Sequence, residues 1–206
     1  MSYRPTAKTR ARQKAQHESL LKTAVSIVAR DGFCGLTISR LARETGIATG
    51  TVYKYFDSKA HLCAEVFRRA TEREVEMVRA ASFPEHAISC RQRLTDAVTI
   101  FAERAILGGR LAYALIAEPV DPAVEQERLI YRKAYADIFK QLIEEGIKTK
   151  EFPDQSSRVS AAALVGILAE VLVAPLGRNE GIKDHKQLIG PIRQFCLRAI
   201  ALYETA

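Results

Sequence analysis

Hydroxyl, phenol and ammonium groups crowd the segment between residues 37 and 59. Such groups donate hydrogen bonds to phosphate oxygens, and the set comprises Thr37, Thr49, Thr51, Tyr53, Lys54, Tyr55 and Lys59. Gly50 stands among them, where the absence of a side chain allows a close approach to a binding partner. Only two acids, Glu44 and Asp57, interrupt the segment. The chemistry indicated is the binding of a polyanion.

Two short helices joined by a glycine turn must position these groups. Thr37 is a good N-cap for a first helix, which Gly46 ends. A second short helix is predicted from Ala48 to Tyr55. On the face opposite the polar donors, the apolar residues predict a small hydrophobic core formed by Leu41, Ala42, Ile47, Val52 and Phe56. A helix-turn-helix of this kind places its second helix in the major groove of DNA. Core packing and DNA contact use opposite faces, so the two interpretations are compatible.

The charge of the chain is concentrated in the same region. The whole chain of 206 residues carries a formal charge of +7. Residues 1–60 hold eleven lysines and arginines against four acids, so the remainder of the chain nets zero. A basic section on a neutral body indicates that one end of the molecule has a polyanionic partner.

The run LTISRLARETGIATGTVYKYFDSK, residues 36–59, resembles the signature of TetR-family transcriptional regulators, T-x2-IA-x2-AGVS-x-GTLY-x-YF-x-SKE-x-L. The matching positions are Thr37, Ile38, Ala42, Gly46, Gly50, Thr51, Tyr53, Tyr55, Phe56, Ser58, Lys59 and Leu62. The resemblance covers about residues 15–65. It implies a homodimeric repressor of nine or ten helices that a small-molecule effector releases from a palindromic operator in double-stranded DNA.

The resemblance also implies roles for individual residues. Thr37, Tyr55 and Lys59 correspond to phosphate contacts. The groove-facing set corresponds to Thr49, Gly50, Thr51, Tyr53 and Lys54. Ala48 departs from the pattern, because the family usually has a serine there whose hydroxyl caps the second helix. Thr49 stands where a lysine is frequent, so the operator sequence does not carry over.

The first fourteen residues form a basic arm without any acid. Its cations are Arg4, Lys8, Arg10, Arg12 and Lys14. One interpretation is a disordered, solvated tail. The other is an arm that reaches into a minor groove, as basic arms of other helix-turn-helix proteins do.

The rest of the chain has helical periodicity nearly throughout, and the predicted fold class is all-α with about nine helices. The predicted organisation is an arm at 1–14, a helix-turn-helix DNA-binding domain at 15–65, and a helical effector-binding and dimerisation domain at 66–206. Breaks are expected at Phe83-Pro84, Gly108-Gly109, Pro119 and Phe152-Pro153, and a very apolar helix is expected from about Gln155 to Leu172.

Small residues make the apolar helix slim, which allows another helix to approach closely. An internal core helix and a subunit interface both fit this pattern, and the resemblance favours the interface. The predicted two-fold contact consists of Val165, Leu168, Leu172, Ile192, Phe195, Ala199 and Leu202.

An effector pocket is predicted in the same domain. The candidate walls and polar groups are Phe101, Arg104, Tyr113, Tyr131, Tyr135, Phe139 and Glu170. Glu170 lies in an apolar run, so it needs a partner if buried. It pairs with Arg104 or Arg198, or it lines the cavity.

Several function classes lack their motifs. We find no nucleophile elbow, phosphate loop or paired acids, so an enzyme is not expected, and no cofactor or metal is expected either. The four cysteines are scattered and read as reduced core residues of a cytoplasmic, nucleoid-associated bacterial protein. No charge-free stretch in the apolar C-terminal third has the length of a membrane span. The remaining rival is an architectural or ligand-independent helix-turn-helix protein that binds nucleic acid.

Overall fold

The computed structural model describes residues 6–177 and 185–201. Within these ranges the chain forms nine helices and no strand, so the all-α prediction is confirmed. The helices are α1 (Ala7–Asp31), α2 (Ile38–Thr45), α3 (Thr49–Val52), α4 (Lys59–Ser82), α5 (Cys90–Gly108), α6 (Arg110–Ile116), α7 (Pro122–Lys148), α8 (Ser157–Gly177) and α9 (His185–Ile200).

Helix α1 begins much earlier than an irregular arm allows. The hydroxyl of Thr6 caps it by accepting a hydrogen bond from the Thr9 amide at 3.3 Å. Residues 7–14 contain alanine, arginine, lysine and glutamine, which are strong helix formers, and no proline or glycine. The interpretation of the arm as a disordered tail is therefore wrong for residues 7–14, which form the first two turns of α1. Arg4 lies outside the described residues.

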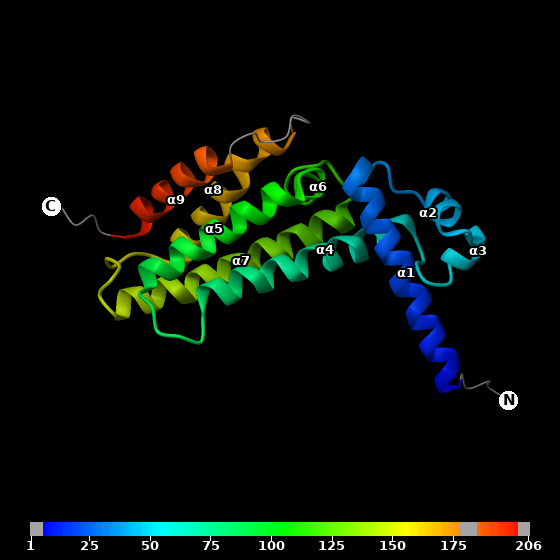
Figure 1. Cartoon of the computed structure of the whole chain (residues 1–206), viewed down its shortest axis with the longest axis horizontal. Helices are drawn as coiled ribbons and strands as arrows, with labels where there is room; N and C mark the ends of the chain where they lie inside the picture. The colour runs from blue at the N-terminus through cyan, green and yellow to red at the C-terminus, as the bar shows by residue number, and fades with distance from the viewer. Residues whose placement is uncertain (1–5, 178–184, 202–206) are drawn as a thin grey trace.

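The N-terminal end of the molecule has its own hydrophobic core. Helices α1, α2 and α3 surround it together with the first half of α4 (Figure 1). Among its fully buried residues are Leu20, Ile27, Leu41, Val52 and Phe56. This core holds the predicted helix-turn-helix against α1, so the outer faces of α2 and α3 are free.

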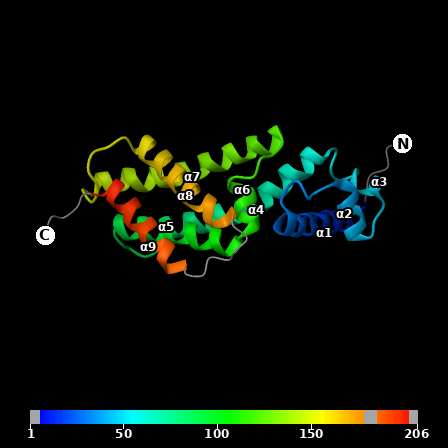
Figure 2. The same ribbon diagram turned by 90° about the horizontal axis from the view of Figure 1, so that it is seen from above.

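Helix α4 links this core to a second and larger one. Its first half contributes Leu62 and Val66 to the N-terminal core, and its second half contributes Val75 and Val78 to the C-terminal core. Figure 2 shows α4 leaving the helix-turn-helix and continuing into the larger bundle. A single helix thus passes from one core into the other. The predicted second domain begins at residue 66, so its first part, residues 66–82, lies within this helix.

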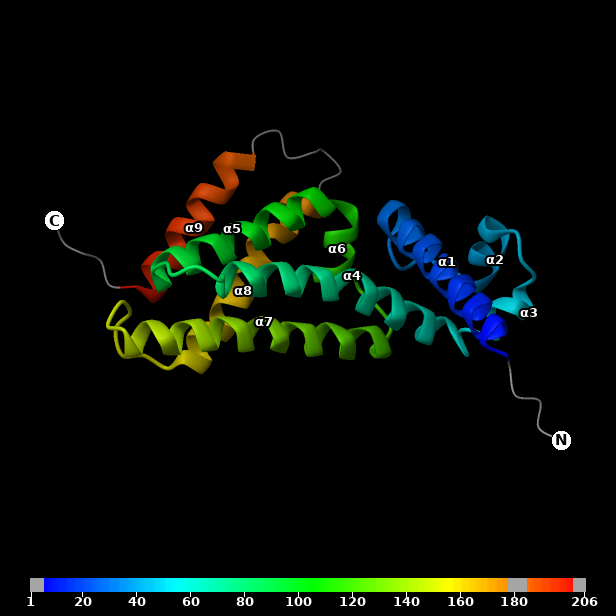
Figure 3. The same ribbon diagram turned by 60° about the horizontal axis from the view of Figure 1, so that its bottom comes forward.

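The larger bundle consists of the second half of α4 together with α5 to α9. Helices α4, α5 and α7 run side by side, and α8 crosses them (Figure 3). Ile138, Phe139 and Leu142 of α7 are completely buried at its centre. The bundle encloses the space in which a small ligand can be held.

Helix α8 is longer than predicted, because it continues through Pro175 to Gly177. Among the described residues it is the one helix long and apolar enough to cross a membrane. A core helix of a soluble protein has the same composition, and α8 buries one face against α6 and α7. Its other face is exposed.

Candidate nucleic-acid interface and internal cavity

The turn between α2 and α3 has the geometry that the sequence predicts. The Thr37 hydroxyl caps α2 by accepting from the Arg40 amide at 3.1 Å. Gly46 ends α2 in the left-handed conformation with φ 68°, and the Ile47 amide donates to the Ala42 carbonyl at 3.1 Å. Ala48 precedes α3 and makes no side-chain cap. The two helices are therefore held by backbone and threonine contacts.

The regular part of the second helix is shorter than expected. It comprises Thr49–Val52, and the chain then continues in turns to Phe56. The amides of Tyr55 and Phe56 both donate to the Val52 carbonyl, at 2.9 and 3.0 Å. A missing cap, a glycine and β-branched residues all weaken helix formation here. Docking of Val52 and Phe56 in the core orders the segment instead.

The predicted DNA contacts lie mostly on the outer face. The exposed members are Ala48, Thr49, Gly50, Tyr53, Lys54 and Lys59. Thr37, Thr51 and Tyr55 are half-buried, and the Tyr55 ring lies 6.1 Å from the ring of His17 on α1. Tyr53 is 51% exposed, which is unusual for a large aromatic side chain in a monomer. The exposed residues among those predicted thus all lie between residues 48 and 59.

Gly50 has no role in the packing of the chain itself. A Cβ atom built on Gly50 meets no heavy atom within 4 Å, and the residue does not have a positive φ. Glycine in a helix costs about 0.5–1 kcal/mol relative to alanine. Neither internal packing nor backbone conformation requires a glycine at this position.

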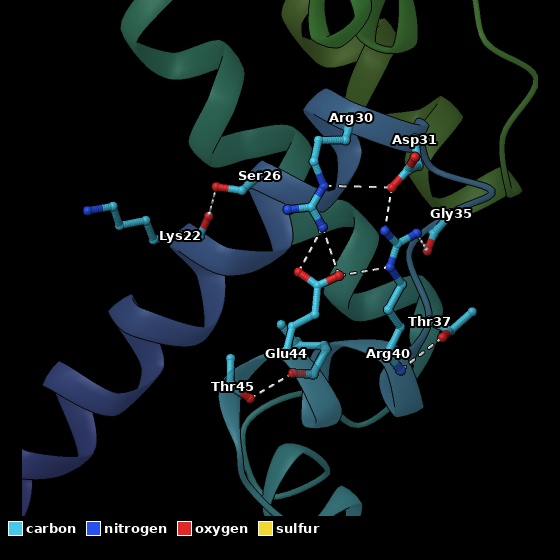
Figure 4. A network of polar contacts seen from close by, with 10 residues as sticks. Lys22, Ser26, Arg30, Asp31, Gly35, Thr37, Arg40, Glu44 and Thr45 are labelled. Atoms are coloured by element: carbon cyan, nitrogen blue, oxygen red, sulfur yellow. Dashed lines mark hydrogen bonds and ion pairs between the residues drawn. The ribbon is translucent and has the colours of Figure 1, made fainter.

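A network of ion pairs ties α2 to α1 (Figure 4). Both carboxylate oxygens of Glu44 accept from Arg30, at 2.7 and 2.8 Å, and one also accepts from Arg40 Nε at 2.9 Å. Arg40 in turn reaches Asp31 and the Gly35 carbonyl. These guanidinium groups keep the pKa of Glu44 below its usual value. Arg30 and Arg40 therefore tie α2 to α1, although the Arg30 side chain remains 54% exposed.

The ion pairs also determine which charged side chains of the N-terminal section have no partner of opposite charge. Asp31 and Glu44 are bound by arginines within the network, Glu18 pairs with Arg69 of α4, and Asp57 faces His61. Three of the four acids of the first 60 residues, Glu18, Asp31 and Glu44, are thus paired with arginines. Among the described residues of this section, the cations without an ion pair are Lys8, Arg10, Arg12, Lys14, Lys22, Arg43, Lys54 and Lys59. The N-terminal end presents uncompensated positive charge.

A cavity of about 120 Å³ lies between helices α4 to α8. Four of the predicted pocket residues line it, namely Phe101, Arg104, Tyr131 and Tyr135. Three do not: Phe139 is completely buried in the core, Tyr113 packs against Gly177 and beneath the Arg110 guanidinium, and Glu170 is exposed on α8. Thr71, Glu74 and Arg128 also line the cavity. Nothing in their local spacing could have identified them, because α4 and α7 come together only in the folded bundle.

Arg128 connects the cavity wall to the end of α6. Its guanidinium donates to the carbonyls of Leu115, Ala114 and Glu118, at 2.9, 3.3 and 2.7 Å. It also pairs with Glu125, while burial lowers its pKa. Arg128 is only 8% exposed. The loop after α6 is therefore fixed by a residue that lines the cavity.

The Glu118 side chain carries this connection to the helix-turn-helix. Its carboxylate is buried and accepts from the amides of Phe33 and Cys34, at 3.1 and 3.4 Å, in the turn between α1 and α2. The Cys34 thiol donates to it at 3.1 Å, and this hydrogen bond is the largest cause that raises the thiol pKa. Cys34 is exposed, so its prediction as a core residue is wrong, whereas the other three cysteines are buried.

Comparison with known proteins locates the family resemblance in the helix-turn-helix. Residues 20–66 match the family model described as bacterial regulatory proteins, tetR family. A helix-turn-helix-type transcriptional regulator of Mycobacterium tuberculosis is 30% identical over 117 residues, which are 57% of this chain. That match spans about half of the relative, 54% of its length. Residues 20–66 are therefore similar to the helix-turn-helix of the tetR family of bacterial regulatory proteins.

Solved structures extend the likeness to the whole fold. The fatty acid degradation regulator FadR from Bacillus halodurans superposes with a TM-score of 0.76 at 21% identity, covering 95% of this chain and 97% of that one. The transcriptional regulator FadR from Bacillus subtilis, solved in complex with stearoyl-CoA, gives 0.76 at 19% identity, with 89% and 99% covered. At such identities the likeness shows the fold.

The predicted subunit contact needs correction. Val165, Leu168, Leu172 and Ile192 are buried within the chain's own core, so they are not available to a partner. Large side chains of α8 face inward because the bundle buries them. The exposed face carries the small residues instead, with Ala162, Ala163, Gly166 and Ala174. Phe195 and Ala199 of α9 are exposed as well, and Leu202 lies outside the described residues.

Glu170 is also not where the sequence placed it. It is exposed on α8 and does not line the cavity. Arg104, one of its predicted partners, instead binds Glu74 of α4 through two nitrogens. An apolar run along α8 does not imply burial on every side, because one face of this helix is exposed. The prediction of a buried carboxylate is wrong.

Proposed function

We propose that this protein is a homodimeric transcriptional regulator of the TetR type, a repressor that binds operator DNA and is released by an effector in the cavity. Its place of action is the nucleoid in the bacterial cytoplasm. Relatives named as transcriptional regulators support this role, and the FadR structure, solved in complex with stearoyl-CoA, supports a small-molecule ligand. The observation that carries the proposal is Gly50, unexplained inside the chain, on an outer face rich in donors.

Release requires a physical link between the cavity and the DNA-binding face. Arg128 lines the cavity and holds the Glu118 carbonyl, and the Glu118 carboxylate holds the turn before α2. A ligand that shifts the end of α6 therefore shifts the support of the helix-turn-helix. A ligand-independent architectural protein has no need of a cavity linked in this way, so the effector-responsive function is favoured.

Replacing Gly50 with alanine is expected to have opposite effects on stability and on DNA binding. The free energy of unfolding should rise by about 0.5–1 kcal/mol, because the unfolded chain loses freedom and space for the methyl group exists. Affinity for a duplex enriched from a random pool should fall at least about tenfold, because the methyl group prevents close approach of the backbone. Urea unfolding and fluorescence anisotropy measure the two effects. A variant that binds DNA as tightly as the parent would remove the main support for this face.

The exposed faces of α8 and α9 form the proposed dimer surface. Val159 is 61% exposed and Phe195 is 57% exposed, which are large values for apolar side chains. Small residues between them allow two helices to approach closely. Two recognition segments on a two-fold dimer can then reach successive major grooves, about 34 Å apart.

Replacing Gly166 with glutamate is expected to convert the dimer into a monomer. A Cβ at this position meets nothing within 4 Å, so the monomer tolerates the change. In the dimer, however, the carboxylate would be buried without a partner. Sedimentation velocity measures the outcome. Gln141→Glu on the exposed side of α7 introduces the same residue and should leave the dimer intact. If Gly166→Glu sedimented as a dimer, the surface would lie elsewhere.

A further inference from the structure

The volume of the cavity is close to that needed by one aromatic ring, and its walls are mostly apolar. Its volume is about 120 Å³, and an apolar protein cavity of ~150 Å³ holds one benzene molecule. Val78, Ala105, Val165 and the edges of several aromatic rings line it. Phe101 and Tyr135 meet edge to face with ring centroids 5.1 Å apart. Such a wall suits a compact hydrocarbon body.

The hydroxyl of Thr71 is anomalous among the helical hydroxyls of this chain. Thr23, Ser26, Thr45, Ser82, Thr95 and Thr99 each donate to the carbonyl four residues earlier. Thr71 is 6% exposed, lines the cavity, and has no hydrogen-bond partner in the described structure. A buried hydroxyl without a partner costs about 1–3 kcal/mol. A ligand oxygen in the cavity would satisfy it.

Tyr135 presents a second hydroxyl to the same space. Burial is the largest cause that raises its pKa, so the phenol stays neutral. No hydrogen bond to its hydroxyl occurs among the residues that the structure describes, whereas the Tyr131 hydroxyl bonds to Glu72 at 3.4 Å. Two neutral groups, each both donor and acceptor, therefore line one cavity.

The charged groups of the wall are already engaged or face solvent. Arg104 donates from Nη2 to Glu74 at 2.7 Å and from Nε to the other oxygen, so this pair is electrically balanced. Arg128 is occupied by three carbonyls and Glu125. Arg132 is exposed. A buried carboxylate would have to compete with Glu74 and lose its hydration, so the interior favours an uncharged ligand.

We propose that the effector is a small uncharged ring compound with one hydroxyl or carbonyl oxygen, which hydrogen-bonds to Thr71 and Tyr135. This inference rests on the proposed effector-binding function and specifies the chemical class of its ligand. Alcohols, phenols and cyclic ketones belong to the class. A hydrocarbon leaves the Thr71 hydroxyl without a hydrogen-bond partner, and a carboxylate ligand is repelled by the carboxylate of Glu74.

Three probes with the same ring and one carbon substituent separate these possibilities. Toluene, benzyl alcohol and benzoate differ only in the group that meets the hydroxyls. Isothermal titration calorimetry on the full chain without DNA should give the highest affinity for benzyl alcohol. Tightest binding of benzoate, equal binding of toluene and benzyl alcohol, or binding of none of them would each overturn the inference.

Thr71→Val tests the hydroxyl itself at nearly constant shape. Affinity for benzyl alcohol should fall about fivefold to tenfold, whereas affinity for toluene should not fall. The thermal midpoint of the empty protein should stay equal or rise, because the substitution removes an unsatisfied buried group. Thr99→Val removes a hydroxyl that is bonded to the Thr95 carbonyl outside the cavity, and it should leave both affinities unchanged. If Thr71→Val bound benzyl alcohol as tightly as the parent, the inference would be wrong.

These measurements do not involve DNA, so they separate the two proposals. Failure to bind an operator with retained binding of benzyl alcohol would contradict the proposed function alone. Operator binding without any affinity for benzyl alcohol would contradict the ligand class alone.

Discussion

Replacing Gly32 with alanine is expected to lower the free energy of unfolding by about 3 kcal/mol or more. Gly32 has φ 73° and ψ −178°, a region of backbone space that is essentially restricted to glycine. A Cβ atom there would lie 2.5 Å from both carboxylate oxygens of Glu118 and 2.7 Å from an Arg110 nitrogen. Backbone strain and the clash both act at the contact between the two cores. Urea unfolding measures the loss.

Gly46→Ala is the matched control for this prediction. Gly46 also has a positive φ, 68°, but a Cβ there meets nothing within 4 Å. Only the left-handed strain remains, which costs roughly 1–2 kcal/mol. Equal losses in the two variants would mean that the Glu118 contact at Gly32 contributes little.

Arg128→Met is expected to cost about 3 kcal/mol and to loosen the distant turn before α2. The methionine fills similar space but leaves the carbonyls of Ala114, Leu115 and Glu118 without this donor. The Glu118 carboxylate is then less well fixed, so the amides of Phe33 and Cys34 should exchange their hydrogens faster. Urea unfolding and amide hydrogen exchange measure the two effects.

Arg132→Met provides the comparison on the same helix. Arg132 lines the cavity one turn after Arg128 but is exposed and makes no ion pair among the described residues. Its loss should leave both stability and amide exchange nearly unchanged. Unaltered exchange at Phe33 and Cys34 in Arg128→Met would break the proposed link between the cavity and the DNA-binding face.

The helix-turn-helix could be predicted because its signals are local. Thr37 caps its own helix, Gly46 ends it, and Val52 and Phe56 point inward at helical spacing. Each feature acts within a few residues, so a linear reading finds it. The full extent of α1 is not predicted, because a run of cations is typical of an arm. The residues of that run are nevertheless strong helix formers.

The cavity and the dimer surface depend on tertiary packing, so they were predicted less well. Thr71 and Arg128 meet only when α4 packs against α7, and nothing near either residue signals this. On α8 the apolar composition indicated burial but not its direction. The bundle buries Leu168 and Leu172 and leaves Gly166 outside. Large apolar side chains therefore do not indicate the dimer surface here, because they pack in the monomer's own core.

The central claim is that the N-terminal face reads DNA as a two-fold dimer. Enrichment of bound duplexes from a random-sequence pool by the full chain tests this most directly. The account predicts a palindromic site whose half-site centres lie about 34 Å apart, one helical turn of DNA. Enrichment of no common sequence, or of a single unpaired half-site, would contradict it.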